Sequence, residues 1–137
     1  MVKISNKSIG LLGGSFDPAH TGHLEISKIA IKKIKLNKIL WIVTKKNPFK
    51  RKSFYSLQQR LNLAKKIAKK VKKINVVYLD KVVKSTRSIN VINYLINKKK
   101  IKNIHFIIGS DNLIKFHKWK SWKKIVKLTK LIVFSRK

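Results

Sequence analysis

The fold of this chain is decided by the stretch Gly13-Gly14-Ser15-Phe16-Asp17-Pro18-Ala19-His20-Thr21-Gly22-His23. It follows residues 9–12, an apolar run that is typical of a buried strand. It precedes residues 24–30, whose apolar side chains recur at helical spacing. The sequence therefore predicts a strand, a glycine-rich loop and a helix in succession.

The loop has the composition of a phosphate-binding turn. Gly13 and Gly14 leave the strand without a Cβ, so the backbone can come close to a ligand there. The helix that follows directs free backbone N–H groups and its positive dipole end at the same place, which favours phosphate. His20 and His23 lie where that helix begins, so both rings can point at one anion. We interpret the stretch as a nucleotide-handling loop with two hydrogen-bond donors.

Length and composition narrow the class of protein. A chain of 137 residues predicts one domain, residues 1–137, with a core that needs no cross-link. The sequence has no cysteine, which excludes disulfides and thiolate metal sites. No apolar stretch reaches the roughly 18 residues that span a membrane, and residues 1–7 lack the pattern of a signal peptide. These features predict a cytoplasmic protein.

The net charge is extreme, with 35 Lys and Arg against 4 Asp and Glu, formally +31. Arginine, which suits bidentate phosphate contacts, is scarce, and the excess is lysine accompanied by much isoleucine and asparagine. That trio indicates an AT-rich coding sequence, so we favour compositional drift over selected nucleic-acid binding. Nonspecific adhesion to nucleic acid is expected in either case.

Strand and helix patterns alternate along the chain. Strands are predicted at residues 9–12, 39–43, 74–79, 105–108 and 131–134, and helices at 24–34, 57–71, 89–96 and 112–128. Short strands that are apolar on both sides favour a parallel sheet covered by helices on both faces. We therefore predict an α/β fold, a Rossmann-like doubly wound five-stranded sheet with ligands beyond the carboxyl ends of the strands. The loops expected there are residues 13–23, 44–55, 80–88 and 109–112.

The pattern Gly-x-Phe-Asp-Pro-x-His-x-Gly-His over residues 14–23 resembles the signature of the nucleotidyltransferase superfamily, which shares its fold with class I aminoacyl-tRNA synthetases. The resemblance implies that His20 and His23 are catalytic and donate to the phosphates of ATP. It also implies an ATP site that includes the loop residues Gly13, Gly14, Ser15 and Phe16.

A second stretch, Gly109-Ser110-Asp111, follows the fourth predicted strand. A glycine at a strand end before a polar helix start is typical of a helix N-cap, which we expect at Ser110. The superfamily has Gly-x-Asp near the adenosine at this point. The resemblance therefore implies that Gly109 lets the nucleotide approach and that Asp111 accepts a hydrogen bond from a ribose hydroxyl.

The order of motifs over residues 8–136 resembles bacterial nicotinate-nucleotide adenylyltransferases. Those enzymes have Phe-x-x-Trp after Gly-x-Asp-x-Leu, and the tryptophan stacks on the pyridine ring. Trp119 fits that position, whereas Trp122 is better explained as packing. Ser88 is expected as an N-cap that touches the nicotinate end.

The loop after the second predicted strand contributes one more candidate. Pro48 restricts the backbone before it, and Lys50 fits the Pro-x-Lys that helps to bind phosphate in the pyridine-nucleotide branch. The resemblance implies a catalytic and substrate-binding part for Lys50. Arg60, on the next helix, is expected to brace the fold rather than to reach substrate.

The implied reaction is attack by the phosphate of nicotinate mononucleotide on the α-phosphorus of ATP, which yields nicotinate adenine dinucleotide and pyrophosphate for NAD biosynthesis. No covalent nucleophile is indicated, so catalysis is expected from positioning and charge stabilisation. Carboxylates are scarce, so Mg²⁺ is expected mainly on phosphates and water, with no metal site on the protein.

Three alternatives stay open. Family members carry near their end a Ser-Ser-Thr-x-x-Arg segment that grips the ATP phosphates, and no such segment follows residue 134 here. Either this sequence is truncated or the product is shortened, so a shortened, inactive remnant is one alternative. An adenylyl- or cytidylyltransferase with another phosphate acceptor is the second, although phosphopantetheine and glycerol-phosphate types match the motifs less well. A basic nucleic-acid-binding domain that keeps the fold without the reaction is the third. The sequence does not determine the oligomeric state.

Overall fold

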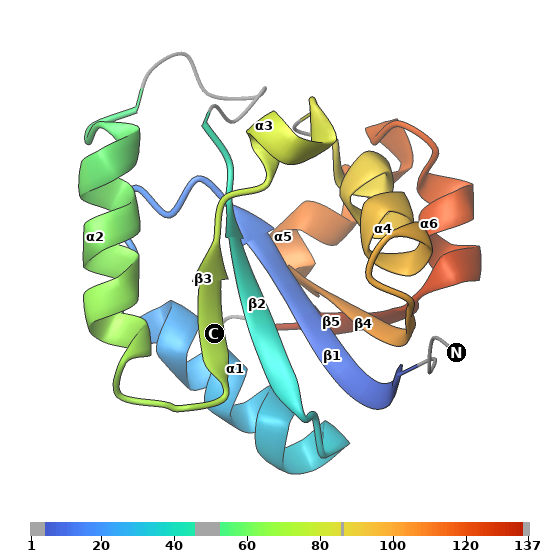
Figure 1. The fold of residues 1–137 in the computed structure, drawn as a ribbon, viewed down its shortest axis with the longest axis horizontal. Helices are drawn as coiled ribbons and strands as arrows, with labels where there is room; N and C mark the ends of the chain where they lie inside the picture. Colours follow the sequence, from blue (N-terminus) through green and yellow to red (C-terminus); the bar gives the residue numbers. More distant parts are fainter. Residues whose placement is uncertain (1–4, 46–52, 86, 136–137) are drawn as a thin grey trace.

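The computed structural model describes residues 5–45, 53–85 and 87–135 and contains a sheet of parallel strands in the order β3-β2-β1-β4-β5 (Figure 1). The strands are β1 (Ser5–Gly14), β2 (Lys38–Val43), β3 (Ile74–Val77), β4 (Ile101–Gly109) and β5 (Lys130–Phe134). Strand order reverses between β1 and β4. A crevice at the carboxyl ends of those two strands is where a doubly wound sheet binds its ligand.

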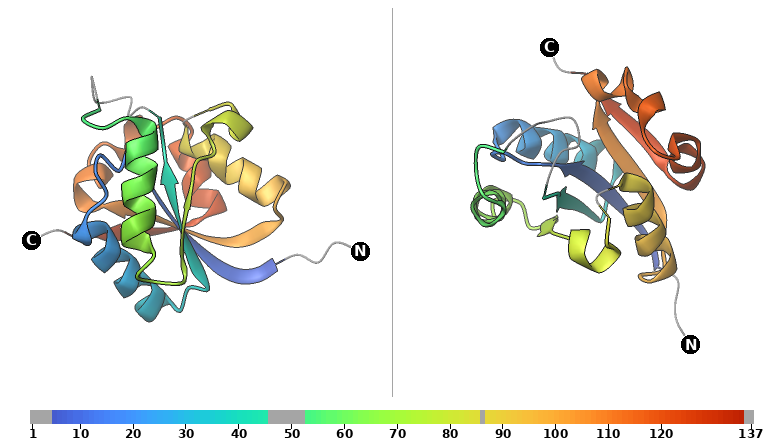
Figure 2. Two further views of the ribbon diagram at one scale, coloured as in Figure 1. Left: turned by 60° about the vertical axis from the view of Figure 1, so that its left-hand side comes forward. Right: turned by 90° about the horizontal axis from the view of Figure 1, so that it is seen from above.

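Helices cover both faces of the sheet (Figure 2). The longer helices are α1 (Thr21–Ile34), α2 (Leu57–Ala68), α4 (Ser88–Asn97) and α6 (Trp122–Leu128), and the short ones are α3 (Asp80–Val83), α5 (Ser110–Leu113) and the 3-10 helix η1 (Phe116–Lys118). The predicted doubly wound fold is confirmed. Within the described ranges, no helix has both the length and the apolar character needed to cross a membrane.

Each face of the sheet has its own apolar core, as two-sided burial of the strands requires. On one face, Ala30 of α1 and Ala64 of α2 pack in the cluster that contains Trp41 of β2. On the other face, Ile92 of α4 and Ile125 of α6 pack with β1 and β4. All five residues are at most 1% exposed, so both helix layers are fixed firmly on the sheet.

Two segments differ from the sequence prediction. The continuous helix expected over residues 112–128 is broken into α5, η1 and α6, because Trp119 is extended (φ −73°, ψ 143°) and Ser121 is left-handed (φ 58°). The loop expected over residues 80–88 contains the one-turn helix α3. Apolar periodicity alone does not reveal that the helix is interrupted here, where the ring of Trp119 packs on Phe106.

A buried histidine near the middle of the sheet makes the stability of the fold depend on pH. His105 on β4 is 4% exposed, and the described structure gives its Nδ1 atom no hydrogen-bond partner. Burial first, and then the charge of nearby Lys130, lower the pKa of the imidazole below its usual 6.5. Unfolding therefore takes up a proton below about pH 6.5, and the folded state loses stability as the pH falls through that range.

We predict that the unfolding free energy, measured in urea, is smaller at pH 5.5 than at pH 7.5. His105→Leu should reduce that difference, because the leucine has no proton to bind in the unfolded state. His117→Leu is the matched control, since His117 is exposed on η1. An equal pH effect in His105→Leu and in the unaltered protein would contradict this explanation.

Candidate nucleotide-binding site

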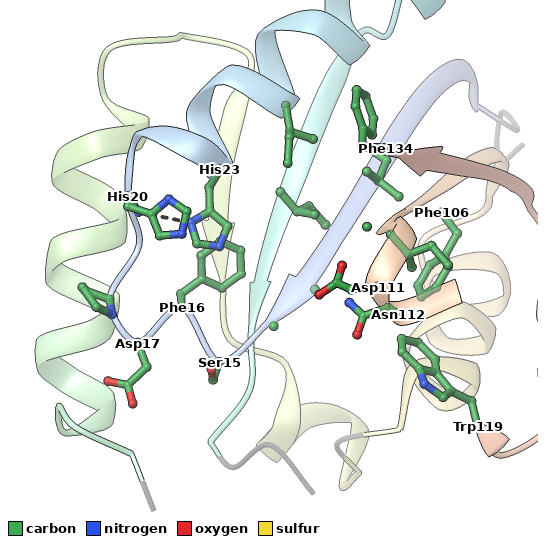
Figure 3. A pocket seen from close by; sticks show the side chains of 18 residues that line it. Ser15, Phe16, Asp17, His20, His23, Phe106, Asp111, Asn112, Trp119 and Phe134 are labelled. Carbon is green, nitrogen blue, oxygen red and sulfur yellow. Dashed lines mark hydrogen bonds between the residues drawn. The ribbon is translucent and has the colours of Figure 1, made fainter. Parts of the chain in front are cut away.

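A cleft of about 370 Å³ opens at the carboxyl ends of β1 and β4, at the reversal of strand order (Figure 3). The loop after β1 and the start of α1 form one side of it, and α5 with the segment around Trp119 forms the other. The cleft is lined by most of the residues proposed from the sequence, namely Gly13, Gly14, Ser15, Phe16, His20, His23, Gly109, Asp111 and Trp119. The topology thus brings together two motifs that lie about ninety residues apart.

The protein itself does not crowd the glycines at the end of β1. A Cβ built on Gly13 or Gly14 meets no heavy atom closer than 3.8 Å. Gly10, by contrast, is required by packing, because a Cβ there lies 2.9 Å from Cδ1 of Leu36. Since both Gly13 and Gly14 line the cleft, the space that they leave is available to a ligand rather than filled by the protein.

The two histidines form a reciprocal cap at the start of α1. His20 is the N-cap, and its Nδ1 accepts a hydrogen bond from the backbone N–H of Gly22 at 3.0 Å. Nδ1 of His23 accepts from the backbone N–H of His20 at 3.1 Å. The ring centroids are 4.1 Å apart. Gly22 is required here, because a Cβ at this position would lie 2.7 Å from Cε1 of His20.

This cap determines how the histidines can meet a ligand. A neutral imidazole whose Nδ1 accepts a hydrogen bond carries its proton on Nε2, so the cap fixes the tautomer of each ring in its neutral form. The sequence predicted that free backbone N–H groups at the start of α1 bind the anion. This is partly wrong, because the N–H groups of His20 and Gly22 already donate to the imidazoles of the cap.

Two consecutive hydrogen bonds from the core hold the backbone of His23 in place. The Trp41 indole N–H donates to Oγ of Ser27 at 2.8 Å, and that hydroxyl donates to the backbone oxygen of His23 at 2.8 Å. The rings of Phe16, His23 and Trp41 contact one another, with centroid distances of 4.6 Å for Phe16–His23, 5.3 Å for Phe16–Trp41 and 5.9 Å for His23–Trp41. Phe16 is 3% exposed with φ 48°, so it supports the histidine more than it faces the cleft.

Arg60 of α2 braces the loops around the cleft, as the sequence predicted. Its guanidinium is 2% exposed and donates to four backbone oxygens at 2.7–3.2 Å. Those oxygens belong to Ser15, Thr44, Lys45 and Tyr55. One side chain therefore ties together the loop after β1, the end of β2 and the segment before α2.

Asp17 and Asp80 hold the same region through their carboxylates. Asp17 accepts from the backbone N–H groups of Phe54 and Tyr55, at 2.6 and 2.9 Å. Asp80 accepts from the N–H of Lys45 at 2.7 Å. Burial raises the pKa of the Asp80 carboxyl above its usual 3.8, although this hydrogen bond and the charges of Arg60 and Lys45 act in the opposite direction.

The opposite wall of the cleft begins at Gly109. A Cβ there would lie 2.6 Å from Oδ1 of Asp111, so only glycine allows that carboxylate to fold back over the strand end. Asp111 is exposed and lines the cleft. The N-cap of α5 is Gly109 and not Ser110, because α5 already begins at Ser110 and no side chain caps it. The prediction of an N-cap at Ser110 is wrong.

Trp119 completes this wall. Its half-buried ring meets those of Phe106 and Phe116 at steep angles of 86° and 62°, with centroids 5.9 and 5.3 Å away. This edge-to-face packing orients the indole at the mouth of the cleft. Trp122 packs on Phe116 and does not line the cleft, so its assignment to packing is confirmed.

One candidate, Ser88, is described and does not line the cleft. Ser88 is the first residue of α4 rather than its N-cap, which is Arg87, and it is not among the cleft residues. The expected cap at Ser88 is therefore wrong, since the helix begins one residue earlier than predicted. Lys50 lies outside the described residues.

Sequence reasoning did not single out several residues that line the cleft. Asn112 and Phe134 are among them, and Asp17 was quoted in the motif without a function. Phe134 has a recognisable signal, because it ends β5, next to the strand end at Gly109. Among the described residues, no group of three or more His, Cys, Asp or Glu side chains comes close enough to hold a metal ion.

The comparison with known proteins agrees with this geometry. Residues 11–137 match the cytidylyltransferase-like family, so the chain belongs to that family of nucleotidyltransferases. The most similar relatives show to which group of enzymes within this family the chain belongs. The chain is 53% identical over 128 residues to a probable nicotinate-nucleotide adenylyltransferase of Pelagibacter ubique, which covers 93% of this chain and 71% of the relative. It therefore belongs with the nicotinate-nucleotide adenylyltransferases, as the sequence motifs predicted.

More distant matches give the same picture. A probable nicotinate-nucleotide adenylyltransferase of Bradyrhizobium sp. strain ORS 278 is 35% identical over 93% of this chain and 67% of its own length. The solved structure of Plasmodium falciparum nicotinic acid mononucleotide adenylyltransferase complexed with NaAD superposes with a TM-score of 0.81. It is 19% identical and covers 96% of this chain and 65% of that one. At that identity the likeness confirms the fold.

We predict that Arg60→Met lowers the unfolding free energy by about 3 kcal/mol or more, because it leaves several buried carbonyl groups without a donor. Urea unfolding followed by circular dichroism measures the change. Arg87→Met is the matched control: Arg87 is exposed, so the same substitution there should change stability by at most about 0.5 kcal/mol. Equal effects of the two substitutions would refute the bracing function.

Proposed function

We propose that this chain transfers AMP from ATP to nicotinate mononucleotide, giving nicotinate adenine dinucleotide and pyrophosphate in NAD biosynthesis. The observation that carries the proposal is the cleft in which the His20 and His23 pair lies across from Asp111 and Trp119. The branch of the family to which the chain belongs supports it. We further propose that residues 1–137 form one domain and act in the cytoplasm.

The cleft suits attack of one phosphate on another without a covalent intermediate. Gly13 and Gly14 let the triphosphate lie close to the end of β1. The Nε2–H groups of His20 and His23 then donate to phosphate oxygens as negative charge builds up in the transition state. Because the cap already fixes both rings, little reorganisation is needed when the reaction occurs. Asp111 accepts a hydrogen bond from a ribose hydroxyl of the nucleotide.

The nicotinate mononucleotide end is assigned to Trp119. Its ring is oriented by Phe106 and Phe116, so a pyridine ring can stack on the exposed part. Lys50 is proposed to offset the charge of the attacking phosphate, and Ser88 to contact the nicotinate end. For Ser88 this requires the loop before α4 to approach the cleft when substrate binds.

We propose that Mg²⁺ binds together with ATP and is not held permanently by the protein. Asp17 and Asp111 are the carboxylates that line the cleft in the described structure, and both oxygens of Asp17 already accept from backbone N–H groups, so Asp111 is the one that we assign to a cation. A hard cation with one protein carboxylate takes its other ligands from phosphates and water. When bound, Mg²⁺ neutralises phosphate charge.

Pyrophosphate release tests the reaction. The protein with ATP, Mg²⁺ and nicotinate mononucleotide should release pyrophosphate, and nicotinamide mononucleotide, phosphopantetheine or glycerol phosphate should release much less. Release with one of the other acceptors alone would keep the reaction type and overturn the acceptor. No release with any acceptor would favour the inactive remnant.

We predict that His20→Asn separates the two functions of His20. Asparagine is a good N-cap, so the stability of α1 should stay within a few tenths of a kcal/mol, whereas His20→Ala should lose about 1 kcal/mol. Both variants lack the Nε2–H donor and should lower kcat by about 10²–10³-fold. Urea unfolding and pyrophosphate release measure the two effects. Normal turnover of His20→Asn would show that His20 serves only as a cap.

We predict that Trp119→Ala raises the KM for nicotinate mononucleotide at least about tenfold, because it removes a stacking contact and buried apolar area. The KM for ATP should hardly change. Trp122→Ala is the matched control, since Trp122 packs away from the cleft and should affect stability but neither KM value. An equal rise in both KM values for Trp119→Ala would contradict its assignment to the acceptor.

A further inference from the structure

The end of the sheet opposite the cleft carries two dense runs of lysine. In a parallel sheet, the connections from helices to strands lie at the amino ends of the strands. Here residues 69–73, between α2 and β3, read Lys-Lys-Val-Lys-Lys, and residues 98–100, between α4 and β4, read Lys-Lys-Lys (Figure 1). Lys35 before β2 and Lys130 at the start of β5 add to these runs. All these lysines are exposed, and we name them the cationic edge.

The acidic residues of the chain all lie toward the other end. Asp17 follows β1, Asp80 follows β3 and Asp111 follows β4, so all three belong to the carboxyl ends of the strands. Glu25, the fourth acidic residue of the sequence, lies near the start of α1 and pairs with Lys28 at 3.6 Å. The cationic edge therefore has no neighbouring carboxylate to neutralise it.

This charge is badly placed to attract the substrates of the cleft. The six residues of β2 alone separate the two ends of the sheet by about 20 Å. Exposed charges are screened within about 8–10 Å at physiological ionic strength. Whatever the origin of the lysines in the coding sequence, a surface of this kind binds an extended anion at the end remote from the cleft.

We propose that the cationic edge binds the phosphate backbone of double-stranded nucleic acid, independently of adenylyl transfer. Five strands at a spacing of about 4.8 Å make an edge about 20 Å wide, which matches roughly six base pairs at 3.4 Å each. The two connections contain neither arginine nor an aromatic residue. They therefore lack the rings that stack on single-stranded bases and the planar guanidinium that best fits base edges, which favours contact with the backbone of a duplex.

The test compares two variants with the same change of net charge. The edge variant carries Lys69→Gln, Lys70→Gln, Lys98→Gln and Lys99→Gln. The control carries Lys81→Gln, Lys115→Gln, Lys120→Gln and Lys124→Gln, which are exposed lysines of α3, the segment around η1, and α6. Fluorescence anisotropy measures the binding of labelled DNA and RNA duplexes of about 20 base pairs at several salt concentrations.

The edge variant should bind each duplex at least about tenfold more weakly at 100 mM salt. Its slope of log K against log salt should become shallower by about 3–4, because each lost phosphate contact removes about 0.9. The control should lose less than about 1 in slope. Saturating ATP should not displace the duplex, and the edge variant should release pyrophosphate at the normal rate.

Equal losses in the two variants would overturn the proposal, since they would mean attraction to the overall charge. Tighter binding of a single strand than of the duplex would overturn it as well. Vesicles of phosphatidylcholine and phosphatidylserine (7:3) test the other class of partner. Loss of vesicle binding in the edge variant, with duplex binding unchanged, would assign the edge to a membrane surface instead. Loss of binding to one duplex type alone would identify whether DNA or RNA is the partner.

Discussion

The guanidinium of Arg60 holds the carboxyl end of this sheet in shape. Loops after parallel strands have few partners for their backbone carbonyls, and here one buried side chain from α2 supplies donors to Ser15, Thr44, Lys45 and Tyr55. The carboxylates of Asp17 and Asp80 complement it by accepting from backbone N–H groups of the same loops. The glycine-rich turn at the end of β1 is rigid because of this framework.

Rigidity at that turn is what makes the histidine pair useful. His20 and His23 each use Nδ1 to cap α1, which fixes the orientation of the two rings. The relay from Trp41 through Ser27 fixes the backbone of His23 from the core side. The residues that are proposed to stabilise the reacting phosphates are thus also the residues that begin the helix, so folding and the orientation of the donors are coupled.

The two ends of the sheet differ in chemistry. The cleft end gathers the acidic residues and the aromatic rings of Phe106, Trp119 and Phe134, which suits a small ligand with a flat ring and a ribose. The amino end exposes lysines without carboxylates or aromatic residues in its two densest connections. A doubly wound topology produces this separation, because every loop from a strand to a helix lies at one end of the sheet and every connection from a helix to the next strand lies at the other end.

The sequence by itself determined the fold class, the order of elements and the motif residues of the cleft. Apolar periodicity fixes which segments are strands and helices, and the spacing of His20, Gly22 and His23 is a local property of one helix start. It also indicated correctly that Arg60 braces and that Trp122 packs. Local patterns of this kind act over a few residues, so they can be recognised without the rest of the chain.

Only the tertiary structure decided which groups are free to meet a ligand. The burial of Phe16 against Trp41 and the break before α6 that places Trp119 on Phe106 depend on partners from distant segments. The caps expected at Ser88 and Ser110 were misplaced, because a serine next to a helix start can be either its N-cap or its first residue, and here both serines are first residues. Hydrogen-bond donors and acceptors are shared across the whole fold, and the sequence does not show which of them are already used.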